Sequence, residues 1–136
     1  MCYLAVMLLG MRTLLLIVVA AVALQAPAKS VWDGVYTEAQ ATRGKAFFDK
    51  ECSRCHDQSD YSDPAFMKTW AGPAFNLFQE ISVSMPMDAP GKLDAQAYVD
   101  LVAFMFKSNS FPAGDTELSP DPDALKLVKI EPKPVR

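Results

Sequence analysis

Two cysteines three positions apart, followed directly by a histidine, constrain this sequence more than any other feature. The motif reads Cys52-Ser53-Arg54-Cys55-His56, and His56 is the single histidine of the 136 residues. Such a motif suits a redox or structural disulfide, part of a zinc site, or a covalent haem attachment. Each chemistry makes different demands on the other residues, so the rest of the sequence can discriminate among the three.

Haem attachment explains the motif best. Structural zinc needs four Cys or His ligands, and beyond residue 28 the chain has only the three in this motif. A thioredoxin-like pair opens a helix after a strand, whereas this motif ends a predicted helix. A structural disulfide leaves His56 and the later Met-Pro segment unexplained. In haem c attachment, Cys52 and Cys55 bond covalently to the porphyrin and His56 is the proximal iron ligand.

One motif predicts one covalently bound haem c per chain. Because there is no second histidine, the sixth position of the iron must be filled by methionine, by another weak donor, or left open.

The N-terminus has the pattern of an export signal. Residues 14–24 are an apolar run preceded by Arg12 and followed by an Ala-Pro-Ala site that ends at Ala28. This order predicts a secretory signal peptide over residues 1–28, and the run is shorter than the roughly 20 residues that span a bilayer. Translation starting at Met11, or an uncleaved anchor, are the alternatives. We expect a periplasmic protein with no membrane span in its mature form, anchored to the membrane if the signal is retained.

Charge and size narrow the class of protein further. Beyond residue 28 the chain has 12 Lys and Arg residues against 16 Asp and Glu residues. That acidic balance argues against nucleic acid as a partner. In an oxidising compartment the two remaining cysteines rarely persist as free thiols. A mature chain this small buries a modest core and gains from a bound cofactor.

Helical patterns predict an all-α fold, because no strand pattern of any length is present. Residues 37–51 begin with a capping-box spacing between Thr37 and Gln40. Residues 94–108 follow the N-cap candidate Asp94 and carry an apolar stripe of Tyr98, Leu101, Val102, Met105 and Phe106. A third helix is predicted over residues 73–84, with its first turn at Pro73 and with Phe75, Phe78 and Ile81 facing inward.

These residues resemble a small class I c-type cytochrome over roughly residues 33–115. Gly44, Phe48 and Cys52 match the first helix of that family, in which the glycine permits a close crossing with the last helix. The resemblance implies a small cytochrome c fold, with three or more helices around one covalent haem. We divide the chain into the signal peptide, a cytochrome domain over residues 29–115, and an extended Pro-rich strap over residues 116–136.

The stretch SVSMPMDAPGKLDAQAYVDLVAF resembles the family's loop that carries the axial methionine, followed by the last helix. The resemblance implies Met85 as the distal iron ligand because it begins a Met-Pro pair, with Met87 as the second choice. Met105 fits the core stripe, and Met67 comes too early for this loop. Tyr61 and Trp70 are candidates to donate to a haem propionate, and core packing is their alternative role. The expected apolar wall of the pocket and core consists of Phe47, Phe48, Phe75, Phe78 and Phe104.

A finer resemblance suggests a function. The stretches GVYTEAQATRGKAFF and FPAGDTEL are similar to monohaem cytochromes linked to quinoprotein alcohol dehydrogenases. This implies an electron carrier rather than an enzyme, with a quinoprotein dehydrogenase as donor and an oxidase or another cytochrome as acceptor. The alternatives are a haem subunit of an oxidoreductase complex, or a ligand-binding sensor with a labile sixth ligand. The Met-Pro segment argues against the sensor.

Overall fold

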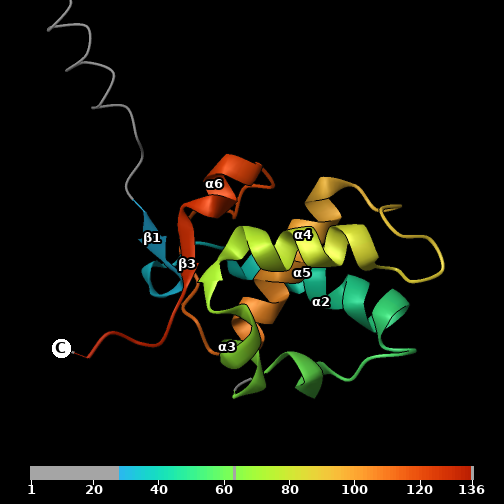
Figure 1. The fold of residues 1–136 in the computed structure, drawn as a ribbon, viewed down its shortest axis with the longest axis horizontal. Coiled ribbons are helices and arrows are strands. Elements are labelled where there is room, and N and C mark those ends of the chain that lie inside the picture. The colour runs from blue at the N-terminus through green and yellow to red at the C-terminus, as the bar shows by residue number, and fades with distance from the viewer. Residues whose placement is uncertain (1–27, 63, 136) are drawn as a thin grey trace, which may run out of the picture.

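The computed structural model describes residues 28–62 and 64–135, and Figure 1 shows helices packed around a crossing of two of them, beside a small sheet. The predicted export signal lies outside the described residues except for Ala28. Three short helical segments carry the label η, of which η2 is a π-helix. The elements are β1 Lys29–Ser30, η1 Val31–Asp33, α2 Glu38–Phe47, η2 Phe48–Cys52, η3 Gln58–Tyr61, α3 Ala65–Trp70, β2 Gly72–Pro73, α4 Ala74–Ser84, α5 Ala95–Ser108, α6 Pro122–Lys126 and β3 Val128–Ile130.

The first predicted helix is present as α2 and η2, which together end at Cys52. Thr37 caps it, because its hydroxyl accepts a hydrogen bond from the Gln40 N–H at 3.1 Å. The Gln40 side chain does not complete the predicted capping box. It is fully buried and binds both backbone groups of Leu118, at 2.9 and 2.8 Å. This part of the prediction was wrong because the Gln40 side chain instead satisfies the buried N–H and carbonyl of Leu118, a residue far away in the sequence.

The last predicted helix is confirmed as α5. Asp94 caps it by accepting from the Ala97 N–H at 2.7 Å. All five residues of the predicted stripe are buried, and so are Val99, Asp100, Ala103 and Phe104. The helix is therefore buried almost all round because α2 packs on one side of it and α4 on another.

α2 and α5 approach each other most closely at Gly44. A Cβ atom at this position would stand 1.9 Å from the Asp100 carbonyl oxygen, so only glycine fits. Phe48 and Phe104 pack together one turn further along, with ring centroids 5.2 Å apart. The close crossing implied by the family resemblance is confirmed.

α4 corresponds to the third predicted helix, but its buried face is turned slightly from the prediction. Phe78 and Ile81 are buried as expected. Phe75 is only half-buried, and the ammonium group of Lys126 lies 5.2 Å from its ring centroid. Ala74 and Leu77 complete the buried face instead, at the spacing i, i+3, i+4 and i+7.

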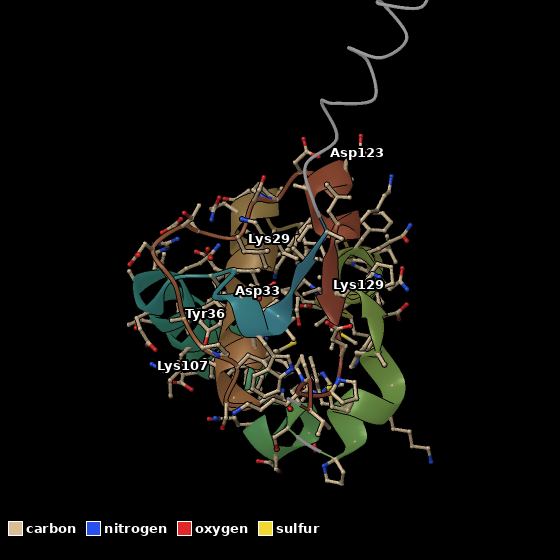
Figure 2. The ribbon with its side chains drawn as sticks, turned by 90° about the vertical axis from the view of Figure 1, so that its left-hand side faces the viewer. Lys29, Asp33, Tyr36, Lys107, Asp123 and Lys129 are labelled. Atoms are coloured by element: carbon tan, nitrogen blue, oxygen red, sulfur yellow. The ribbon has the colours of Figure 1, made fainter. Side chains whose placement is uncertain are left out.

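The tail contains more structure than the extended strap that the sequence predicted. Residues 116–136 include α6 and β3, and β3 is the central strand of a three-stranded sheet. β3 pairs in parallel with β1 and antiparallel with β2, and Figure 2 shows β1 and β3 side by side at Lys29 and Lys129. These strands were not predicted because two or three residues are too few to show alternation. The buried tail residues are Leu118, Leu125, Val128 and Ile130.

An ion-pair cluster joins α2, α5 and the tail. Arg43 on α2 binds Asp100 through Nε at 2.8 Å, and its Nη1 binds Glu117 in the tail at 2.8 Å. The Asp100 side chain is only 9% exposed and also accepts from Gln96 at 2.8 Å. A buried carboxylate requires such partners, so these contacts hold three segments in one register.

Candidate functional site

A cavity of about 480 Å³ lies among η2, α4, α5 and the loops that follow η2 and α4. Its volume falls in the range of about 300–1,000 Å³ that is usual for ligand pockets. Apolar residues predominate in the lining, and the charged residues Glu51, Arg54 and Asp88 are half-buried or exposed. The full lining is Phe48, Glu51, Cys52, Arg54, Cys55, His56, Tyr61, Ile81, Met85, Pro86, Met87, Asp88, Leu93, Tyr98, Leu101 and Met105.

The C-x-x-C-H motif forms one tight turn at the edge of this cavity. Cys52 ends the π-helix η2, and its carbonyl accepts from the N–H groups of both Cys55 and His56, each at 3.1 Å. All three residues therefore line the same cavity. No disulfide joins Cys52 to Cys55. Burial raises the pKa of the Cys52 thiol, and the negative charge of Glu51 raises it further.

An aromatic neighbour packs beside the histidine. The ring of Tyr61 meets the His56 ring edge-on, with centroids 5.6 Å apart, and it also meets Phe48 at 6.0 Å. Burial raises the pKa of Tyr61 to about 12, with smaller contributions from the charges of Asp60 and Cys52. Its phenol is therefore neutral at ordinary pH and able to donate a hydrogen bond.

The connection between α4 and α5 brings the predicted methionines to the same cavity. Met85 and Met87 both line it, yet they differ in exposure. Met87 is 80% exposed, whereas Met85 is half-buried at the C-cap of α4. The Met85 carbonyl accepts a hydrogen bond from the Tyr98 hydroxyl at 2.7 Å. Of the two, Met85 is the methionine with a fixed backbone and a shielded side chain.

The structure brings together most, but not all, of the residues that the sequence singled out. Met105 is buried in the core as expected and also lines the cavity. Tyr61 lines the cavity, whereas Met67 and Trp70 pack against the core elsewhere. Of the five phenylalanines expected at the pocket wall and core, only Phe48 lines the cavity.

Several residues of the lining were not identified as site residues from the sequence, among them Leu93, Tyr98 and Leu101. Tyr98 and Leu101 belong to the apolar stripe of α5, and a stripe indicates burial without saying which buried residues face a ligand.

The residues present fit a covalently attached haem. Two thiols and an imidazole come from one turn, a thioether comes from a second segment, and the space among them is lined mainly by apolar side chains. This donor set is the one that c-type haem requires.

The fold and this site together define a class of protein, the class I c-type cytochromes. Residues 39–105 match the sequence model of the family described as cytochrome c oxidase, cbb3-type, subunit III, and the chain is accordingly a class I c-type cytochrome that carries covalent haem c. The matched stretch runs from α2 into α5 and includes both the C-x-x-C-H turn and the Met-Pro loop. No curated protein and no solved structure is significantly similar to the chain.

The family match does not test the association with quinoprotein dehydrogenases, which stays a prediction.

Among residues 28–62 and 64–135, no helix has both the length and the apolar character that a membrane crossing requires.

Proposed function

We propose that the protein is a periplasmic electron carrier in which Cys52 and Cys55 attach the haem, His56 is the proximal ligand and Met85 is the distal ligand. The observation that carries this proposal is the convergence of all four side chains on one cavity from two separate segments. The bound haem supplies an iron that takes up and releases one electron. His56 and Met85 would together complete the ligands that the protein supplies to the iron, which would leave no position for a substrate.

The surrounding residues have two roles in this proposal. Phe48, Leu101 and Met105 are buried and line the cavity, so they exclude water and lower the local dielectric, which tunes the potential. The exposed parts of the lining, including Cys55 and Met87, leave an edge at which an electron can pass to another protein. Interfaces for such transfer are small and short-lived.

We further propose a quinoprotein dehydrogenase as the electron donor and an oxidase or another cytochrome as the acceptor. The donor is supported by the resemblance of the segments around the haem motif, and the acceptor agrees with the family description, which names an oxidase subunit. Export to the periplasm is supported by the signal pattern of residues 1–28.

A visible spectrum of the purified protein tests the proposal directly. We expect a covalently held c-type haem whose reduced spectrum is unchanged by carbon monoxide, because the iron is saturated. Prompt binding of carbon monoxide at neutral pH would instead indicate a ligand-binding haem protein. If acidified organic solvent extracts the haem from the protein, the haem is not covalently attached, and the proposed attachment through Cys52 and Cys55 is wrong.

Two matched variants test the distal ligand. In Met85→Leu the reduced protein is expected to bind carbon monoxide, because the thioether is lost while the side-chain volume is kept. In Met87→Leu the spectrum is expected to match the wild type. The reverse pattern would assign the ligand to Met87.

A second function is favoured by the family match, because its description names a subunit of an oxidase complex. In that case the chain is a firmly held haem subunit rather than a free carrier. Gel filtration of a native extract distinguishes the two, since a free carrier elutes at the size of one chain of about 15 kDa or less.

A further inference from the structure

The hydrogen bond between Tyr98 and Met85 connects two residues that both line the cavity. Tyr98 lies in the first turn of α5 and is 3% exposed. Its hydroxyl donates to the Met85 carbonyl at 2.7 Å. Met85 lies at the C-cap of α4, so the bond joins the end of one helix to the beginning of the next, across a connection of ten residues from 85 to 94.

Contacts other than the hydrogen bond to Met85 also hold the Tyr98 ring in place. The Asp94 cap fixes the first turn of α5 through the Ala97 N–H at 2.7 Å. The ring of Phe78 on α4 meets the Tyr98 ring edge-on, with centroids 6.4 Å apart. The direction of the hydroxyl is therefore set by the packing of α4 against α5, and not by the loop.

Both polar groups of the Met85 backbone, the N–H and the carbonyl, form hydrogen bonds. Its N–H donates to the Ile81 carbonyl at 3.1 Å, which continues the pattern of α4. Its carbonyl accepts from Tyr98 and, at the longer distance of 3.4 Å, from the N–H of Gly91. Gly91 has a φ of +75°, which favours glycine and turns the loop back toward Met85.

We propose that Tyr98 is a positioning residue for the axial methionine: its hydroxyl fixes the Met85 backbone so that the thioether stays at the cavity. This inference rests on the proposed role of Met85 as the distal ligand. A residue that is merely part of the core would need only its ring, whereas a buried phenol needs a partner for its O–H. Here that partner is the backbone carbonyl of Met85, the residue whose side chain is the proposed iron ligand.

The expected consequence is a change in how often the thioether leaves the iron. An external ligand such as imidazole binds only while the sixth position is open, so its apparent affinity follows the open fraction. Removal of the Tyr98 hydroxyl increases that fraction by an amount that corresponds to one hydrogen bond, roughly threefold to tenfold.

The experiment compares the haem-loaded wild type with Tyr98→Phe, both in the ferric state, in a titration with imidazole followed by visible absorption. In Tyr98→Phe we expect the apparent Kd for imidazole to fall by roughly threefold to tenfold. The weak long-wavelength band of thioether-bound ferric iron should therefore disappear at a lower imidazole concentration in Tyr98→Phe than in the wild type. A purely structural effect of the substitution would move neither quantity.

Tyr36→Phe is the matched control. Tyr36 is also buried, at 1% exposure, and its hydroxyl also donates to a backbone carbonyl, that of Phe111, at 2.7 Å. It does not belong to the cavity lining. Both variants therefore lose one hydrogen bond from a tyrosine hydroxyl to a backbone carbonyl, and only Tyr98→Phe is expected to change imidazole affinity. Equal affinities in the two variants would overturn the proposal.

Met85→Leu separates failure of this inference from failure of the proposed function. If Met85→Leu increases the affinity for imidazole and Tyr98→Phe does not, Met85 is the ligand and Tyr98 does not position it. If Met85→Leu leaves the affinity unchanged, the ligand assignment is wrong, and the role of Tyr98 is wrong with it.

Discussion

At the scale of single residues, Gly44 has the strictest requirement in the described fold. The carbonyl oxygen of Asp100 occupies the space that a side chain at Gly44 would need. The approach is between two backbones, so no rotation of a side chain can relieve it. The position of α2 against α5, and with it the position of Phe48 and Cys52 at the cavity, depends on the absence of one Cβ atom.

We predict that Gly44→Ala lowers the free energy of unfolding by about 1–3 kcal/mol, because the two helices must separate to admit the methyl group. Helix propensity alone would give the opposite sign, a gain of about 1 kcal/mol. Denaturant unfolding followed by circular dichroism measures the difference. Ala46→Gly, at an exposed position of α2, is the control for propensity, and a stabilised Gly44→Ala would contradict the close crossing.

At the scale of elements, two polar side chains of α2 bind the tail, a role that the helical pattern of the sequence did not predict for them. Gln40 binds the N–H and the carbonyl of Leu118, and Arg43 binds Glu117 beside it. The two residues lie three positions apart, on one face of α2. This face therefore holds residues 117 and 118 through four hydrogen bonds, counting both contacts made by each side chain.

Gln40→Glu tests the polar contact without a change of volume. The carboxylate can accept from the Leu118 N–H but cannot donate to the Leu118 carbonyl. We expect a loss of about 2–4 kcal/mol in the free energy of unfolding at neutral pH, because a buried charge then faces an unpaired oxygen. Burial raises the pKa of an introduced carboxyl, so the loss should shrink as the pH falls and the group binds a proton.

Denaturant unfolding of the variant and the wild type, compared at each pH, measures this loss. Gln79→Glu makes the same change of charge at an exposed position of α4 and should have little effect at any pH. A deficit in Gln40→Glu that does not depend on pH would argue against the buried contact with Leu118.

At the scale of the whole molecule, both ends of the described chain contribute to one core. β1 and β3 pair, Trp32 donates to the Glu131 carbonyl at 2.8 Å, and Tyr36 donates to Phe111. Closing the chain this way buries Val31, Leu125 and Ile130 almost completely. The tyrosine also couples global stability to alkaline pH, because burial raises the pKa of Tyr36 to about 12, with a smaller contribution from the charge of Glu38.

The direction in which stability changes with pH follows from the pKa of Tyr36 in the folded state and in the unfolded state. Between pH 10 and pH 12 the unfolded chain has lost the Tyr36 proton while the folded chain keeps it. The folded state then binds more protons, so its stability falls as the pH rises through this range. Tyr61, with a pKa raised to the same value, acts in the same direction.

We predict that Tyr36→Phe is less stable than the wild type by about 1 kcal/mol at pH 8, because it lacks the hydrogen bond to Phe111. Between pH 10 and 12 its stability should fall less steeply, with a residual slope from Tyr61. Denaturant unfolding at closely spaced pH values measures both effects. Parallel stability curves for the two proteins over this range would contradict a raised pKa at Tyr36.

Much of the helical architecture was predictable from local patterns. The caps at Thr37 and Asp94, the stripe on α5 and the family's glycine at position 44 depend on neighbours in sequence or on a spacing that one helix imposes. The same holds for the C-x-x-C-H turn, because five consecutive residues form it. The haem class followed from that turn and is confirmed by the family match.

What the sequence determined by itself was therefore the chemistry of the site and the positions of the main helices, since both arise from short-range spacing. Only the tertiary structure decided which of two methionines is shielded, that Gln40 serves the tail rather than its own helix, and that a tyrosine in an apolar stripe bonds to Met85. The physical reason is that a buried polar group must find a partner. Which partner is within reach depends on segments that meet only after the chain has folded.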